Sequence, residues 1–366
     1  MKRIIKYSFL FWVSVLFVAC TKDDVYVEEH KGDITITLMS TSLTTKGEKP
    51  GEDALNENKI NTVHYFLFPV DAGNPEVIDY DVQPSHWGVL QNLNSTNTAS
   101  VQLKVSEPVF NKVLFPRPYN DCNVYVIVNL PSDVAAQIGT DRSLGKLQGL
   151  ALQSDFTKDK QEAFVMEGMG KVTVSDRAAE NAASGTVAVK RVAAKMTVNV
   201  NVLKEVEIDG VKWKSQPGAM KMDFYNGVKN AVVSANPEDV VPSYFNLTGL
   251  SFSEANAQSQ TLQDSWEYQC RPFYSYPVKW NIGDESEPYF KITLPWTHET
   301  TEDGSTQWVT KETFYKVILG GEILSHNTWS DLTIKLSAPG NFEDFPEYNV
   351  LIPDVGYKVV DWSEAT

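Results

Sequence analysis

Residues 186–202 read TVAVKRVAAKMTVNVNV. Apolar and polar side chains alternate along most of this stretch, which is the period of a β-strand with one buried face. Many of its residues are β-branched, as is common in strands. We therefore interpret residues 186–202 as one long strand, which begins just after the small and polar residues 178–184.

Similar runs occur along the whole chain. Most are β-branched or aromatic and are bounded by Asn, Asp, Gly or Pro, which indicates short strands joined by turns. The predicted strands are 33–42, 62–70, 99–105, 123–130, 164–174, 220–225, 289–294, 313–319, 328–336 and 357–362. Helical signals are few, and the best one covers residues 131–150, where Ser132 and Asp133 could cap a turn. The sequence predicts an all-β protein.

The N-terminus has the pattern of a lipoprotein signal peptide. Lys2, Arg3 and Lys6 precede an apolar stretch of residues 7–18, and Ala19 and Cys20 follow. This stretch is too short to span a bilayer, which takes about 20 residues. We expect cleavage after residue 19 and acylation of Cys20, which would hold the protein on a Gram-negative outer membrane. A plain secretory signal is the alternative.

Chain length favours two domains after the signal peptide. The remaining 347 residues would make two units at roughly 100 to 200 residues each. We expect a tether at 20–32, an N-terminal β-sandwich at 33–185 and a C-terminal β-sandwich at 186–366. Residues 47–58 are polar and charged, and are expected to form an exposed loop.

Charge and cysteine content exclude several classes of protein. Loss of the three basic residues of the signal peptide takes the formal net charge from −15 to −18, which disfavours binding to nucleic acid. Only Cys122 and Cys270 then remain as thiols, so a disulfide framework is excluded. We expect both to be buried apolar residues, with a bond between them as the alternative.

No residues in the chain form a recognisable catalytic motif. The histidines at 30, 64, 86, 298 and 326 are scattered, and there is no phosphate-binding glycine loop, serine elbow or Cys-His signature. Glu299, Glu302 and Asp303 could bind calcium, although a solvated hairpin tip explains them better. Most tryptophans lie in or beside strand patterns, and only Trp87 is expected to be exposed enough to stack on a sugar. We predict neither an enzyme nor a cofactor.

Five segments, taken in order, resemble the fimbrillins, the FimA-like and Mfa-like type V pilins of Bacteroidales. They are residues 61–68 (NTVHYFLF), 123–131 (NVYVIVNLP), 164–168 (FVMEG), 187–198 (VAVKRVAAKMTV) and the pair 315–319 (YKVIL) with 324–329 (LSHNTW). The chain departs from the family pattern at Ser325-His326-Asn327 and at Trp329, which stand where the family usually has Arg-Asn and Tyr. The resemblance spans nearly the whole mature chain.

The resemblance implies two transthyretin-like sandwiches and assembly of subunits by strand exchange. In that family a trypsin-like protease removes the first strand by cutting after a basic residue in the loop that follows it. Here the first strand would be residues 33–42, at an edge of the leading sandwich, with Ile34, Ile36 and Leu38 facing the core. Lys46 is the best-placed cleavage site, because Pro50 follows the other candidate, Lys49.

The C-terminal segment has the alternation that a replacement strand requires. Tyr348, Val350 and Ile352 alternate before Pro353, and a second set follows it, namely Val355, Tyr357 and Val359. Pro353 lacks an amide hydrogen and is expected at the bend between two short strands. An ordinary last strand, folded on its own domain, is the equal alternative in the unassembled precursor.

These observations favour a fimbrial subunit at the cell surface that supports adhesion. Its expected partners are other pilin subunits, a processing protease, the outer membrane through its lipid, and a host or bacterial surface ligand. A shaft subunit is favoured, and tip or anchor roles stay open. A surface glycan-binding lipoprotein of a nutrient-uptake system is the alternative from another class, and it would depend on Trp87 rather than on Lys46.

Overall fold

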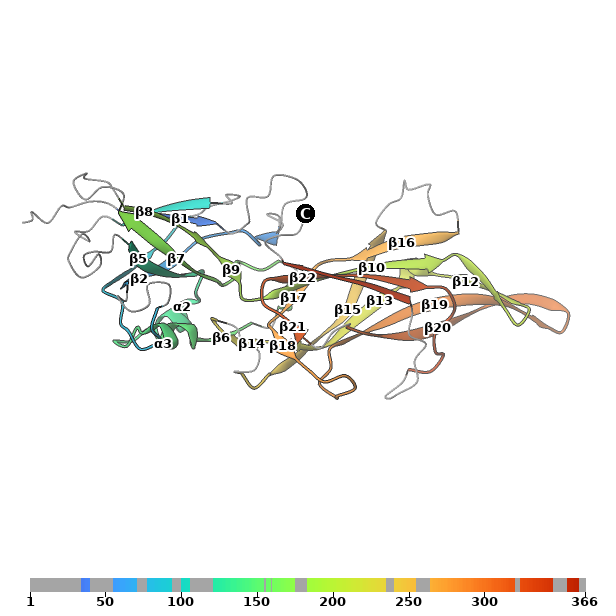
Figure 1. Ribbon diagram of the computed structural model, residues 1–366. Helices are drawn as coiled ribbons and strands as arrows, with labels where there is room; N and C mark the ends of the chain where they lie inside the picture. Colours follow the sequence, from blue (N-terminus) through green and yellow to red (C-terminus); the bar gives the residue numbers. More distant parts are fainter. Residues whose placement is uncertain are drawn as a thin grey trace, which may run out of the picture.

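The computed structural model shows a protein built almost entirely of β-strands. It describes residues 34–39, 55–70, 78–93, 100–105, 121–154, 156–158, 160–174, 183–234, 240–254, 264–319, 323–344 and 354–361. Most strands belong to two large sheets, which lie one after the other along an elongated molecule (Figure 1). Among the described residues, no helix has the length and apolar character needed to cross a membrane.

The first sheet contains most strands of the N-terminal half. They are β1 (Ile34–Met39), β2 (Val63–Pro69), β3 (His86–Leu90), β4 (Ser100–Val105), β5 (Asp121–Val128), β7 (Met166–Val174), β8 (Ala183–Ala188) and β9 (Lys190–Arg191). Their order is β3-β2-β5-β7-β8-β1-β4, and β9 also pairs with β7. All neighbours are antiparallel except β1 and β8, which run parallel.

The second sheet contains most strands of the C-terminal half. They are β10 (Ala194–Leu203), β11 (Glu205–Ile208), β12 (Val211–Ser215), β13 (Lys221–Val228), β15 (Tyr244–Glu254), β16 (Ser265–Cys270), β17 (Phe273–Ser275), β19 (Tyr289–Glu302), β20 (Ser305–Ile318), β22 (Thr328–Leu336) and β23 (Asp354–Asp361). The order is β11-β12-β19-β13-β15-β16-β10-β22-β23, with β17 on β10 and β20 on β19.

Small elements complete the fold. One two-stranded sheet joins β6 (Ala151–Gln153) to β14 (Asn230–Val232), and another joins β18 (Val278–Lys279) to β21 (Ile323–Leu324). In the part of the chain that the structure describes, the helices are α2 (Ser132–Ala135), α3 (Leu144–Gln148) and the 3-10 turn η2 (Pro217–Ala219). Both α-helices lie within the predicted segment 131–150. Ser132 is the first helical residue of α2 and not its cap, because the cap position is Pro131 and no side chain bonds there.

Strands β2 and β5 are buried on both faces, which explains their nearly continuous apolar sequences. Val63, Leu67 and Val126 belong to a core that β1 also enters. Phe66 and Ile127 belong to a second cluster with the buried residues of α2 and α3. This second cluster continues into the second sheet, so the two halves of the chain share one apolar core.

The predicted strand 186–202 is divided into three. Residues up to Arg191 pair within the first sheet as β8 and β9, and β10 begins the second sheet at Ala194. The chain therefore changes sheets at Val192 and Ala193, both buried, and residue 185 falls inside β8. A uniform alternation could not reveal this change, because both parts are strands with the same period.

The buried thiols lie in separate cores. Cys122 in β5 and Cys270 in β16 are both free, as expected for small apolar residues, and the alternative of a bond between them is not realised. Burial raises the pKa of Cys122 to about 12 and that of Cys270 to about 11. Neither thiol is therefore a ready nucleophile at neutral pH.

Glu167 lies on the face of the first sheet opposite to that of Met166, which packs with β1, and it is paired with Ile127 of β5 and Lys190 of β9. Burial raises the pKa of its carboxyl to about 7, although Lys190 and the hydroxyl of Tyr125 oppose the shift. The folded protein therefore binds this proton more tightly than the unfolded chain. The stability that the protonated carboxyl contributes is complete below about pH 4.5 and is lost as the pH rises to about 7.

We expect Glu167→Gln to stabilise the protein at pH 8 and to have little effect at pH 5. Glutamine has the shape of the protonated acid, so it avoids burial of a charge. The expected gain in the free energy of unfolding at pH 8 is about 2 to 3 kcal/mol. Thermal unfolding at the two pH values measures it, with Glu162→Gln as the control because Glu162 is exposed. An equal shift at both pH values would contradict the assignment.

Candidate assembly site

The candidate site is the position of β1 in the first sheet. Strand β1 lies between β8 and β4, with Ile36 opposite Gly185 of β8 and Leu103 of β4. The backbone amide of Val189 also donates to the carbonyl of Met39, at 2.8 Å. The expectation of an edge strand is therefore wrong: β1 is bonded on both sides, and β4 forms the edge (Figure 1).

The side chains of β1 alternate as the sequence predicts. Ile34, Ile36 and Leu38 are each 0% exposed, whereas the residues between them are half-buried. The three enter the core that also contains Val63, Tyr65 and Leu67 of β2 and Val124 and Val126 of β5. At about 1.5 to 3 kcal/mol for each buried aliphatic side chain, they contribute on the order of 5 to 9 kcal/mol before ordering costs.

Strand β8 forms a close-packed wall beside β1. A Cβ atom added at Gly185 would lie 2.1 Å from the backbone oxygen of Lys171 in β7. One added at Gly170 would lie 2.7 Å from the backbone oxygen of Thr186. Glycine at these two positions lets the backbones of β7 and β8 approach, so the wall cannot accept larger residues there.

Asn129, which directly follows β5, binds the segment of residues 59–61 to the first sheet. Its side-chain oxygen accepts from the backbone amide of Asn61 at 2.8 Å, and its Nδ2 donates to the carbonyls of Lys59 at 2.6 Å and Phe164 at 2.9 Å. Its φ of 55° lies in the left-handed region that asparagine tolerates better than most residues. Asn129 therefore ties three segments together.

We expect Asn129→Ala to lower the free energy of unfolding by about 2 to 4 kcal/mol, because it leaves three partly buried backbone groups without their partner and strains φ. Urea unfolding of the purified protein measures the loss. Asn92→Ala is the matched control, since Asn92 has a similar φ of 57° but is exposed. Equal losses in the two variants would show that backbone strain alone, and not the hydrogen bonds, is responsible.

A buried polar cluster joins the residues just before this segment to the second sheet. The carboxylate of Glu57, 0% exposed, lies 3.0 Å from Nζ of Lys195 in β10 and accepts from the hydroxyl of Tyr274 in β17. Arg191 is also 0% exposed, and its Nε donates to the backbone oxygen of Glu57 at 2.9 Å. Its Nη2 donates to the side-chain oxygen of Asn58.

The burial of Glu57 and Asn58 corrects the expectation that residues 47–58 form an exposed loop throughout. Of those residues the structure describes 55–58, which form a short turn, and the side chains of Glu57 and Asn58 at its end are buried. A buried carboxylate needs partners, and these come from Lys195 and Tyr274, whereas Arg191 binds the backbone oxygen of Glu57. All three residues are far from Glu57 in sequence. The motif VKRVAAK at residues 189–195 contains Arg191 and Lys195, but no residue near Glu57 in the sequence indicated that they would bind it.

The predicted donor strand lies partly in β23. Val355, Tyr357 and Val359 belong to this strand, which pairs antiparallel with β22 at the end of the second sheet, Tyr357 opposite Leu332. This is the alternative in which the last strand is folded on its own domain. Tyr348, Val350 and Ile352 lie outside the described residues, as do Cys20 and Lys46.

The chain between β22 and β23 is anchored to β12, β19 and β20 up to Asp344. The backbone groups of Asn341 and Phe314 exchange two hydrogen bonds of 2.8 and 3.0 Å. The ring of Phe342 lies over Trp213, with centroids 5.4 Å apart, and Asp344 accepts from Nζ of Lys291 at 3.2 Å. A strand that left the second sheet would therefore remain attached through this segment.

Trp87 does not form an open sugar platform. It lies in strand β3 and not in a loop, and although it is 45% exposed, the guanidinium of Arg142 lies 3.8 Å from its ring centroid. Trp308 and Trp266, at 49% and 37%, are also exposed, and each has a lysine near its ring. Exposure alone therefore does not single out Trp87 as a binding residue.

The acidic residues near 300 form a hairpin tip. Strands β19 and β20 are joined by Asp303 and Gly304, whose φ values of 52° and 77° fit a tight two-residue turn. No group of three His, Cys, Asp or Glu among the described residues could hold a metal ion. The long hairpin extends beyond the rest of the second sheet (Figure 1).

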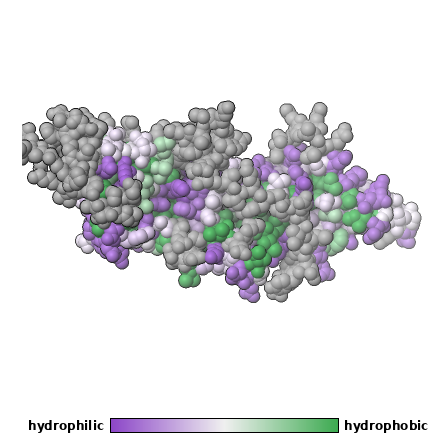
Figure 2. All heavy atoms as spheres, in the orientation of Figure 1, coloured by the Kyte–Doolittle hydropathy of each residue, from purple (hydrophilic) through white to green (hydrophobic). Residues whose placement is uncertain are grey.

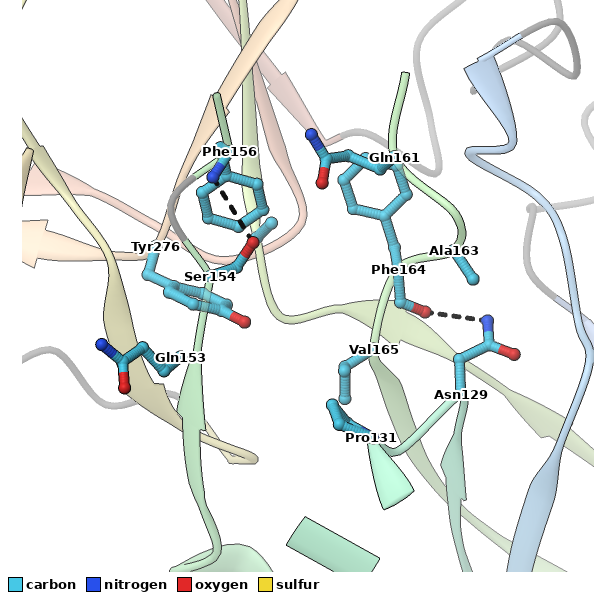
Figure 3. A pocket seen from close by; sticks show the side chains of 11 residues that line it. Asn129, Pro131, Gln153, Ser154, Phe156, Gln161, Ala163, Phe164, Val165 and Tyr276 are labelled. Atoms are coloured by element: carbon cyan, nitrogen blue, oxygen red, sulfur yellow. Dashed lines mark hydrogen bonds between the residues drawn. The ribbon is translucent and has the colours of Figure 1, made fainter. Parts of the chain in front are cut away.

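A cavity of about 130 Å³ lies at the junction of the two sheets (Figure 3). Phe156 and Tyr276 line one side of it, with ring centroids 4.9 Å apart, and Asn129 and Phe164 line the other. Its polar lining consists of amides and hydroxyls without a charged side chain. The cavity therefore offers neither an ion site nor groups for acid–base chemistry.

The surface in Figure 2 is mixed, and its hydrophobic residues gather mainly over the part that contains the second sheet.

In sequence comparisons, no family model and no curated protein matches this chain. The fold, in contrast, matches solved structures over nearly their whole length. A fimbrilin (FimA) of Porphyromonas gingivalis is 11% identical, with a TM-score of 0.51 over 91% of this chain and 97% of that one. The chain has the fimbrillin fold.

Two further structures support this assignment. A candidate cell adhesion protein of Parabacteroides distasonis has a TM-score of 0.52 at 12% identity, over 92% of this chain and 98% of that one. Another, from Bacteroides eggerthii, has a TM-score of 0.50 at 16% identity, over 91% and 96%. At such identities the likeness concerns the fold, and it confirms the all-β, fimbrillin-like architecture that the five sequence segments predicted.

Proposed function

We propose that this protein is a structural subunit of a surface fimbrium and that it polymerises by exchange of strand β1 for the C-terminal strand of another copy. The observation that carries the proposal is the placement of β1. It is the first strand of the fold, it is fully inserted, and its three core residues are completely buried. Residues 40–54, which contain Lys46, separate it from the rest of the chain.

In this scheme the precursor is exported as a lipoprotein, acylated at Cys20 and held on the outer membrane. A protease with trypsin-like specificity cuts after Lys46, and the strand that carries Ile34, Ile36 and Leu38 is released. Its loss leaves unpaired backbone groups along β8 and an open apolar core. Such a surface aggregates unless another strand pairs with it.

The C-terminal segment of a second copy has the right spacing to fill that core. Val355, Tyr357 and Val359 repeat the i, i+2, i+4 spacing of the buried residues of β1, and Tyr348, Val350 and Ile352 provide a second set. Burial of five such side chains would contribute on the order of 10 kcal/mol before ordering costs. Joints of this strength can hold a filament without covalent bonds. The names of the neighbouring structures, a fimbrilin and cell adhesion proteins, support an adhesive surface role.

We expect Lys46→Ala and, separately, deletion of residues 348–366 to give folded monomers that cannot assemble. The first variant retains β1, and the second has no strand to donate. Wild-type precursor treated with trypsin should instead form heat-stable ladders on denaturing gels and filaments under negative stain. Circular dichroism establishes that each variant is folded. Unchanged ladders from both variants would rule out strand exchange.

A further inference from the structure

Arg191 is one of the largest fully buried side chains of the protein, and it lies three residues after the end of β8. Strand β8 is the parallel neighbour of β1 and therefore one wall of the candidate site. A guanidinium is rarely buried to this extent unless its donors have partners. The groups that Arg191 bonds therefore show which segments support the end of β8 at the candidate site.

Loss of β1 affects its two neighbours differently. Among the described strands, β4 pairs with β1 alone, so its described pairing disappears with β1. Strand β8 keeps its five pairs with β7 but loses all six pairs with β1 and the bond from Val189 to Met39. In the described part of the chain, β8 is thus the wall that can persist while the site is empty.

The hydrogen bonds described for Arg191 do not involve β1. Its side chain donates to the backbone oxygen of Glu57 and to the side chain of Asn58. Its backbone amide donates to the side-chain oxygen of Asn327 at 3.1 Å, and the amide of Asn327 donates to the carbonyl of Ala193 at 3.0 Å. Each of these partners lies after residue 46 and would survive cleavage there.

The partners of Arg191 are themselves fixed to the second sheet. Glu57 pairs with Lys195 of β10 and with Tyr274 of β17, and both side chains are buried. The end of β8 is therefore linked to an element that strand exchange leaves intact. In the empty first domain, this link replaces part of the support that β1 provided.

We propose that Arg191 is a positioning residue that keeps β8 in register while the β1 position is empty, so that the donor strand of a second copy can pair with it. The proposal rests on the proposed strand exchange. It assigns to Arg191 and its hydrogen-bond partners a role in the subunit that accepts a strand, and none in the subunit that donates it.

The test compares full-length wild type, Arg191→Met and Arg191→Lys. Methionine keeps the length of the side chain without its donors, and lysine restores one charged donor. Arg142→Met is the control for loss of a partly buried arginine on the same domain. Hydrogen exchange over residues 183–188 of β8 and 63–69 of β2 is read in the intact proteins. After cleavage with trypsin it is read in the same variants without residues 348–366, because no donor strand then fills the β1 position. Ladder formation is measured with the cleaved full-length proteins.

For Arg191→Met we expect at least tenfold faster exchange of β8 than in wild type after cleavage, with β2 unchanged, and at least a tenfold lower yield of polymer. Arg191→Lys should recover part of both, and Arg142→Met should behave as wild type. Should Arg191→Met fail to fold, Asn58→Ala removes one acceptor and should give the same pattern more weakly.

The outcomes separate the two proposals. If wild type itself forms no polymer after cleavage, the strand-exchange proposal fails and this inference fails with it. If wild type assembles and Arg191→Met assembles equally well, only the inference is overturned. Faster exchange in β8 and β2 alike would also overturn it, because Arg191 would then stabilise the whole domain and not the wall of the site.

Discussion

Ile36→Asp is expected to lower the free energy of unfolding of the precursor by about 4 kcal/mol or more. The substitution removes a fully buried aliphatic side chain and places a carboxyl group without a partner in the core shared by β1, β2 and β5. This is a large fraction of the 5 to 15 kcal/mol that stabilises a typical domain. The first thermal transition of the precursor should therefore move to a much lower temperature.

Thr35→Asp is the matched control for this prediction. Thr35 is on the same strand but points to the opposite face and is half-buried, and its neighbour on β4 is Lys104. We expect a change of less than about 1 kcal/mol. The small fraction of Ile36→Asp precursor that folds should still form polymer after cleavage. The contacts between its subunits should be as stable as in wild type, because β1 has been removed from the polymer. A normal melting temperature of the Ile36→Asp precursor would show that β1 is not part of its core.

The alternation of short apolar runs was enough to predict the fold class. Strands β1, β2, β4, β5, β7 and β22 lie where period-two patterns predicted them. For β1 and β22 this succeeded because alternate side chains are buried, which sets the spacing of the apolar residues independently of the overall topology. Strands β2 and β5 are buried on both faces and were recognised as short apolar runs bounded by turn residues. The strands that sequence reasoning missed, such as β11, β12 and β16, carry mostly half-buried or exposed residues, so their alternation is weak.

Pairing partners could not be predicted in the same way. The sequence of residues 33–42 identifies a strand, but an edge strand and an interior strand can have the same pattern when only one face is buried. The position of β1 between β8 and β4 depends on residues more than 60 positions away. The long hairpin of β19 and β20 was recognised only at its buried base, because the residues near its tip are exposed on both faces.

The polar junction was the least predictable part of the candidate site. Glu57 stands among several charged and polar residues, and only its partners from β10 and β17 make its burial tolerable. Arg191 and Lys195 belong to a segment that resembles the fimbrillin pattern, which indicated their place in the chain but not their contacts. Long-range ion pairs of this kind leave no local signal.

Mixing two assembly-deficient variants tests strand exchange most directly. The first variant lacks residues 348–366 and is cleaved with trypsin, so it can only accept a strand. The second is Lys46→Ala, which keeps β1 and can only donate its C-terminal strand. After the protease is inhibited, the two are mixed in equal amounts and analysed by size-exclusion chromatography with light scattering and by denaturing gels without heating.

Neither variant alone should form ladders, and the mixture should give a 1:1 heterodimer without longer ladders, since neither partner can extend the chain. Differently tagged copies identify the heterodimer. The absence of a heterodimer, or ladders from either variant alone, would contradict the account that one copy gives up its first strand and receives the C-terminal strand of another.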